Sequence, residues 1–64
     1  MRVDLFFNDG QAHTIDMAIS PHLGETIFLG GRLYKIEDVI YDLDSKGLAA
    51  INVRLGKPVD ASGT

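Results

Sequence analysis

The stretch from Gly24 to Asp44, GETIFLGGRLYKIEDVIYDLD, decides the fold that we expect for the whole chain. Residues 25–29 predict a short strand. The Gly30-Gly31 pair that follows predicts a two-residue hairpin turn, since glycine readily adopts the positive φ angles of such turns. Residues 32–43 then predict a second, much longer strand.

The alternation of apolar side chains changes phase within this long strand. Tyr34 and Ile36 lie in one phase. The other phase holds Val39, Tyr41 and Leu43. Because a shift of one residue exchanges the two faces of a strand, we expect a bulge or bend near Glu37-Asp38 that keeps both groups inward. Strands that bend in this way let a small sheet curl into a barrel.

The N-terminal third of the chain predicts a hairpin. Residues 2–7 alternate with a period of two, and Asn8-Asp9-Gly10 is typical of a tight turn. Residues 13–19 predict the return strand rather than a helix, because they are rich in β-branched side chains. One face of this strand would hold His13, Ile15, Met17 and Ile19. Residues 20–24, which contain proline, predict a loop.

The C-terminal part completes the expected sheet. Residues 44–47 predict a turn, and residues 48–55 predict the last strand with Ala49, Ile51, Val53 and Leu55 inward. Residues 56–64 are expected to form a flexible tail that adds little to the fold. The sum is an all-β domain over residues 1–55: five strands in a small, strongly bent barrel or antiparallel sheet.

Composition narrows the class of protein. A chain of 64 residues without cysteine has one marginal core and no disulfide, so we expect it to associate with another chain, most simply as a homodimer. Six Lys/Arg against nine Asp/Glu give a net charge of −3, which argues against a nucleic-acid binder. The sequence shows neither a signal peptide nor an apolar run long enough to span a membrane, so we expect a cytoplasmic protein.

The sequence contains no convincing motif for binding a metal ion or a cofactor. Residues 42–47 begin like a calcium loop, but Lys46 and Val53 stand where oxygen ligands are required. His13 and His22 lack a fixed local spacing, which favours structural or surface roles over metal binding. The glycines between residues 24 and 31 precede no helix and therefore predict turns rather than a phosphate loop. We expect no cofactor and no metal.

Catalysis also finds little support. The serines lie in predicted loops or in the tail, beside no evident base: Ser20, Ser45 and Ser62. No cysteine is present to act as a nucleophile. We therefore expect that the protein is not an enzyme.

Exposed aromatic and acidic side chains are the candidates for binding. Phe6 lies on the nominally polar face of its strand, so either both faces are covered or Phe6 contributes to an interface. Tyr34 and Tyr41 can bury their rings while their hydroxyls reach a polar rim. We expect these three aromatics to anchor a protein partner, because aromatic residues dominate binding hot spots. The surrounding charged rim would consist of Glu37, Asp38, Asp42 and Asp44.

Three short motifs resemble a known group of proteins. These motifs are Pro21-x-x-Gly24-Glu25-Thr26-Ile27, Gly31-x-x-Tyr34-x-Ile36 and Val39-Ile40-Tyr41-Asp42. They resemble small β-rich proteins encoded by bacteriophages, many of which are SH3-like barrels. The resemblance covers residues 1 to about 55 and implies an SH3-like fold. Some proteins of this group inhibit bacterial defence systems by binding a host effector or a signal molecule.

Taken together, the residues and the resemblance predict a protein-binding module without catalytic activity. The resemblance further implies that this module is a phage-type inhibitor of a bacterial defence system and acts in the host cytoplasm. Two alternatives stay open: a sponge for a nucleotide-like small molecule, and a small barrel that stacks the bases of single-stranded nucleic acid on its aromatics.

Overall fold

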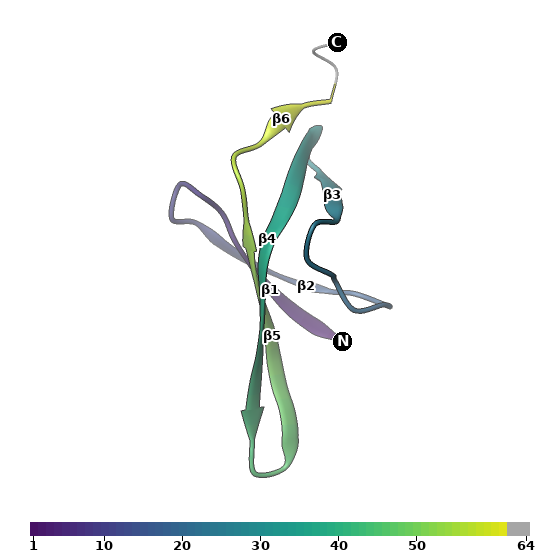
Figure 1. Cartoon of the computed structure of the whole chain (residues 1–64), viewed down its shortest axis with the longest axis vertical. Coiled ribbons are helices and arrows are strands. Elements are labelled where there is room, and N and C mark those ends of the chain that lie inside the picture. The colour runs from purple at the N-terminus through teal and green to yellow at the C-terminus, as the bar shows by residue number, and fades with distance from the viewer. Residues whose placement is uncertain (62–64) are drawn as a thin grey trace.

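A single curled sheet makes up the computed structural model, which describes residues 1–61 (Figure 1). Its strands are β1 (Arg2–Phe6), β2 (Ala12–Asp16), β3 (Thr26–Leu29), β4 (Arg32–Asp44), β5 (Gly47–Leu55) and β6 (Val59–Asp60). No helix occurs within these residues. The predicted all-β fold is confirmed, in the form of a half-barrel.

The strand order corrects one expectation. The sheet runs β2-β1-β5-β4-β3, and β6 adds to β4. All neighbours are antiparallel except β1 and β5, which are parallel, so the sheet is mixed rather than purely antiparallel. No hairpin connects these two strands. Their relative direction therefore depends on how the intervening chain crosses over, which local sequence does not encode.

β4 is the strand that joins the two parts of the half-barrel. Its first residues, Arg32 to Lys35, pair with β3 through the predicted turn, in which Gly30 and Gly31 have φ angles of 60° and 80°. Its later residues pair with β5. The register shifts between Ile36 and Asp38, so the predicted bulge is confirmed.

The core lies where β1, β4 and β5 meet. It consists of Val3, Leu5, Ile36, Ile51, Val53 and Leu55, none more than 2% exposed. Three positions predicted to point inward are exposed instead: Tyr41, Leu43 and Ala49. β2 ends at Asp16, so Ile19 belongs to the following loop and is 73% exposed.

Residues 56–61, expected as part of a flexible tail, hold a short strand that the sequence did not predict. Gly56 donates its backbone N–H to the carbonyl of Lys35 at 2.9 Å. In β6, Val59 then pairs with Leu33, and the N–H of Ala61 reaches the carbonyl of Gly31 at 3.2 Å. The rest of the predicted tail, residues 62–64, lies outside the described residues.

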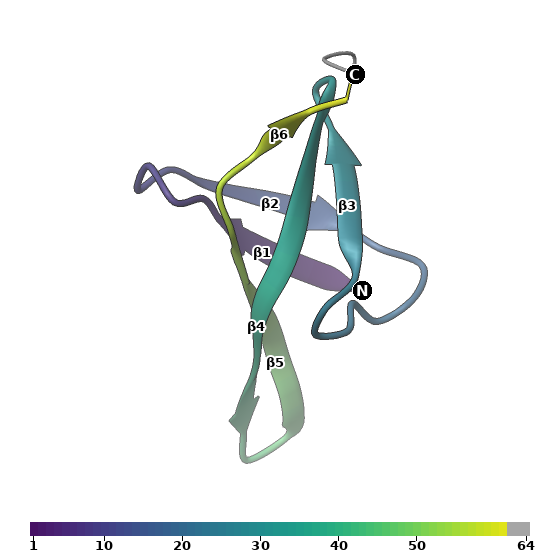
Figure 2. The same cartoon turned by 45° about the horizontal axis from the view of Figure 1, so that its top comes forward.

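The molecule is elongated because one hairpin projects from the sheet. Its radius of gyration is 12.4 Å, against roughly 11 Å for a compact domain of this length. Figures 1 and 2 show the far ends of β4 and β5 extending beyond the other strands. We call residues 40–50, which comprise these ends and their turn, the hairpin tip.

Candidate binding surface

The hairpin tip exposes apolar side chains on both faces of the sheet. Tyr41 lies opposite the buried Ile51, and Leu43 lies opposite Leu48, so these side chains continue the face that carries the core. Yet Tyr41, Leu43 and Leu48 are 51%, 67% and 52% exposed. We call the face that carries the core the inner face and the opposite face the outer face. On the outer face, Ile40 is 53% exposed. The inner face therefore continues into the hairpin tip, where its apolar side chains are no longer buried.

Local sequence explains how the tip closes. The Asp44 carboxylate accepts a hydrogen bond from the backbone N–H of Lys46 at 2.8 Å, which fixes the turn. Gly47 follows with a φ angle of 120°, a value that other residues rarely adopt. The register shifts again between Asp42 and Leu43, which places a second irregularity inside the tip.

Both edges of the hairpin tip lack a neighbouring strand among residues 1–61, because β1 pairs with β5 only over residues 51–54. The longer unpaired edge belongs to β4. β3 pairs with β4 only as far as Lys35, and Ile36 exchanges backbone hydrogen bonds with Gly24 and Glu25 at 2.9 and 2.8 Å. Beyond this point, no strand of residues 1–61 pairs with β4 on the side away from β5. We call the backbone of residues 38–44 on that side the tip edge. Its N–H and C=O groups are open to a further strand.

The predicted anchor and rim residues fall into three places. Phe6, 42% exposed, lies on the outer face of β1 beside Arg54 of β5, and Asp38 lies on the other side of this arginine. Glu37 bonds Arg54 at 3.2 Å. The structure therefore brings Phe6, Glu37 and Asp38 together around Arg54, but not with the tyrosines.

The two tyrosines lie on the inner face of β4 but in different halves of the strand. Tyr34 is half-buried, and its ring meets that of Phe7 edge-on at a centroid distance of 5.2 Å. Tyr41 lies at the hairpin tip, near the exposed carboxylates of Asp42 and Asp44. Of the predicted set, these last three residues lie together at the hairpin tip, with Tyr41 on the inner face of β4 and the two aspartates on its outer face.

Sequence reasoning missed a second exposed apolar group. Phe28 pairs with Leu33, which in turn pairs with Val59 of β6. The three side chains form a row across the outer face of β3, β4 and β6, and Phe28 and Val59 are 65% and 63% exposed. The row is complete only because β6 pairs with β4. The small and polar residues of the C-terminal segment did not predict this strand.

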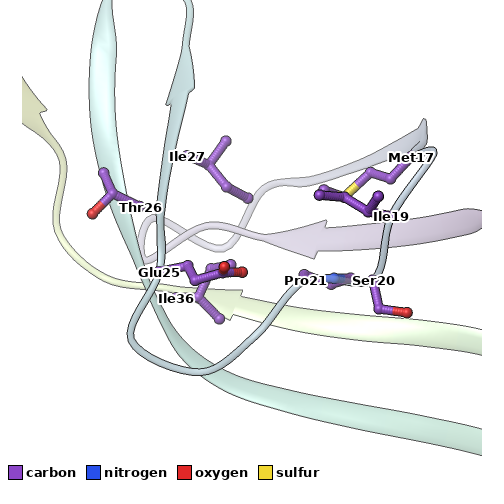
Figure 3. Close-up of a pocket in the computed structure, with 8 residues that line it drawn as sticks. All are labelled: Met17, Ile19, Ser20, Pro21, Glu25, Thr26, Ile27 and Ile36. Atoms are coloured by element: carbon purple, nitrogen blue, oxygen red, sulfur yellow. The ribbon is translucent and has the colours of Figure 1, made fainter.

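The half-barrel is open between β2 and β3, where two grooves lie. Figure 3 shows the first, of about 380 Å³, between residues 17–21 and residues 25–27, with the buried Ile36 among its lining. The second, of about 400 Å³, lies beside the Phe7–Tyr34 ring pair, between the turn near residues 9–11 and the turn near residues 29–32. The sequence did not predict the first groove: Pro21 predicted only a loop, whereas the structure buries it in the lining of the groove.

Polar side chains near the first groove are bonded to their surroundings. The Ser20 hydroxyl donates to Sδ of Met1 at 3.5 Å. The Glu25 carboxylate accepts from the backbone N–H of His22 at 2.8 Å, and its oxygen lies 3.5 Å from Nδ1 of His22. His13 lies on β2, opposite Leu5. Within residues 1–61, no group of three or more His, Cys, Asp or Glu side chains is placed to hold a metal ion.

One carboxylate has a perturbed acidity. Asp16 accepts a hydrogen bond from the N-terminal ammonium of Met1 at 2.8 Å. This hydrogen bond, together with the attraction between the two charges, lowers the pKa of Asp16 below its ordinary value. The group is exposed and distant in sequence from the candidate binding residues, so we assign it to the stability of the β1–β2 pair.

Comparisons with protein-family models, with curated proteins and with solved structures find no match for this chain. Among residues 1–61, no helix is long and apolar enough to cross a membrane. The functional argument therefore rests on the geometry described above.

Proposed function

We propose that this protein acts without catalysis as a protein-binding module and that the hairpin tip is its contact surface. The observation that carries the proposal is the exposure of Tyr41, Leu43 and Leu48 on a face that is buried elsewhere in the sheet. A two-stranded hairpin is only marginally stable in water by itself. A partner that covers the apolar face of the tip supplies the missing layer.

The chemistry of the tip suits a protein partner. A tyrosine ring offers a large apolar area and a polar hydroxyl, a combination enriched in binding hot spots. Asp42 lies on the opposite face of β4 and Asp44 lies at the turn, so both carboxylates flank the apolar group. Charges at the border of a contact surface guide association more than they add affinity. The resemblance to phage inhibitors of bacterial defence adds the expectation that the partner is a host effector.

Affinity capture from bacterial lysate tests this proposal. The wild-type chain is compared with the double variant Tyr41→Ser, Leu43→Ser, which removes apolar area only from exposed positions of the tip. The matched control is Phe28→Ser, which removes an aromatic at least as exposed as Tyr41 from the row on the outer face. We expect a protein retained in stoichiometric amount by the wild type and by the control, but not by the double variant.

Circular dichroism of all three proteins establishes that they are folded. The proposal is contradicted if the double variant retains the same protein as the wild type, or if the wild type retains no protein from lysates of any host tested.

A small-molecule sponge is the second candidate, and the groove over Ile36 favours it. Its volume of about 380 Å³ falls within the range of ligand pockets, and Met17, Ile19 and Ile27 give it an apolar lining. A ligand held there would stabilise the folded chain by RT ln(1 + L/Kd), where L is the free ligand concentration, so the melting temperature would rise with that concentration. Thermal melts with a panel of nucleotides test this candidate, and an Ile27→Asp variant that loses the shift would locate the ligand.

A further inference from the structure

The tip edge presents two chemically different faces to any strand that pairs with it. On the inner face lie Val39, Tyr41 and Leu43. On the outer face lie Asp38, Ile40, Asp42 and Asp44. Side chains directly opposite each other on paired strands are about 4.5–5.5 Å apart between Cβ atoms. An added strand therefore sets one set of alternate side chains against apolar groups and the other set mainly against carboxylates.

A second copy of the same edge fits this arrangement poorly. In a two-fold antiparallel pair centred on Tyr41, Asp38 of one copy lies opposite Asp44 of the other. Centring the pair on Ile40 sets Asp38 opposite Asp42. Centring it on Asp42 sets this residue opposite itself. Like charges directly opposite each other destabilise a pair of strands, so these three registers are unfavourable for a second copy.

We infer that the tip edge binds an extended, basic segment of another protein as an additional strand, in which Lys or Arg alternates with apolar residues. Backbone hydrogen bonds along the unpaired edge supply affinity, as in other cases of strand addition. The basic side chains meet the three aspartates, and the apolar side chains extend the layer formed by Tyr41. This inference rests on the proposed function, since it specifies the chemistry of the protein partner.

Charge favours this occupant over the alternatives. Among residues 1–61, the three aspartates of the edge form no salt bridge, whereas Glu37, at the bulge, is paired with Arg54. The chain as a whole carries a net charge of −3, which attracts a basic segment from a distance. An acidic or neutral strand would satisfy the backbone but would leave the carboxylates without cationic partners.

A peptide titration followed by NMR tests the inference on the full chain. The probe is a capped synthetic peptide in which lysine alternates with valine and leucine. The first control replaces every lysine with glutamate, and the second carries a methyl group on every backbone nitrogen, which removes its N–H donors. We expect the basic peptide alone to bind and to shift the amide resonances of residues 38–44 more than those of β2 or β3.

A matched pair of variants separates local pairing from overall attraction. Asp42→Lys reverses one charge at the centre of the edge, whereas Asp60→Lys makes the same change on β6, and both aspartates are exposed. Reversing one cross-strand charge pair is expected to weaken binding of the basic peptide about fivefold or more. Asp60→Lys is expected to change the affinity less than twofold, and both differences should shrink as salt is added.

Three results would overturn the inference. They are the absence of binding by the basic peptide, equal weakening by Asp42→Lys and Asp60→Lys, and resonance shifts centred on the edges of β2 or β3. These experiments test the proposed function and the strand-addition inference independently. If capture identifies a partner that depends on Tyr41 and Leu43 while the peptide does not bind, the proposed function stands and strand addition is wrong.

Discussion

The two ends of β5 have the same kind of sequence but different surroundings. Val53 and Leu55 are at most 1% exposed, whereas Leu48, on the same strand, is 52% exposed. The difference lies across the sheet: β1 pairs with residues 51–54, and no described strand pairs with residues 47–50 on that side. An apolar pattern therefore shows which side chains are suited to burial, and the neighbouring strands decide which of them are buried.

The largest expected effect comes from truncating one leucine at each end of this strand. Leu55→Ala should lower the free energy of unfolding by about 2–5 kcal/mol, because it leaves a cavity in a core of six residues. Leu48→Ala should lower it by less than about 1 kcal/mol, since the side chain is half exposed. Urea denaturation followed by circular dichroism measures both. Equal losses of unfolding free energy would mean that Leu48 is buried in solution, and the contrast between the two ends of β5 would then be wrong.

A second test replaces the turn glycines at the two ends of β4. Gly31→Ala places a side chain at a φ angle of 80° and should cost about 1–2 kcal/mol of global stability, because this turn aligns β3 with β4 and also contacts Ala61. Gly47→Ala is strained as well, but its turn joins only two strands. We expect its main effect in hydrogen exchange, as faster exchange of amides in the hairpin tip.

Urea denaturation and amide exchange of both glycine variants provide the comparison. If Gly47→Ala lowers the global stability as much as Gly31→Ala, the tip unfolds together with the rest of the sheet rather than before it.

A smaller effect is expected at the bulge between the two regions. Glu37 bonds Arg54 at 3.2 Å, and both side chains are about half exposed. Glu37→Gln should therefore cost only about 0.2–1 kcal/mol, and less at high salt. Asp42→Asn, which breaks no salt bridge, is the control and should leave stability unchanged. A loss well above this range would show that the bulge depends on the ion pair.

The smallest expected effect concerns the β1–β2 pair, far from the tip. The pKa of Asp16 is lowered by its hydrogen bond to the N-terminal ammonium, so the ionised carboxylate stabilises the folded chain. This contribution is present above the ordinary aspartate pKa and is lost as the pH falls through the lower, folded-state value. Asp16→Asn should lower the melting temperature slightly at neutral pH and not at strongly acidic pH. A difference that persists in acid would point to a cause other than charge.

The candidate surface was predictable only in part. Tyr41, Asp42 and Asp44 were identified from residue type and position, and the structure places them together at the hairpin tip. Phe6 and Tyr34 were chosen for the same reasons but lie elsewhere on the sheet. Aromatic character indicates what a side chain can contribute to a surface. Which aromatics share a surface depends on strand order and on the direction in which the sheet curls.

The sequence by itself determined the local features: the alternating strands, the Gly30-Gly31 turn and the bulge beside Glu37. Each of these depends on the φ preference of one residue or on the phase of a few side chains, which neighbouring residues encode. The tertiary structure alone decided the parallel pairing of β1 with β5, the addition of β6 to β4 and the exposure of the hairpin tip. These features depend on contacts between segments far apart in the chain. The residues of one strand do not determine which other strand pairs with it.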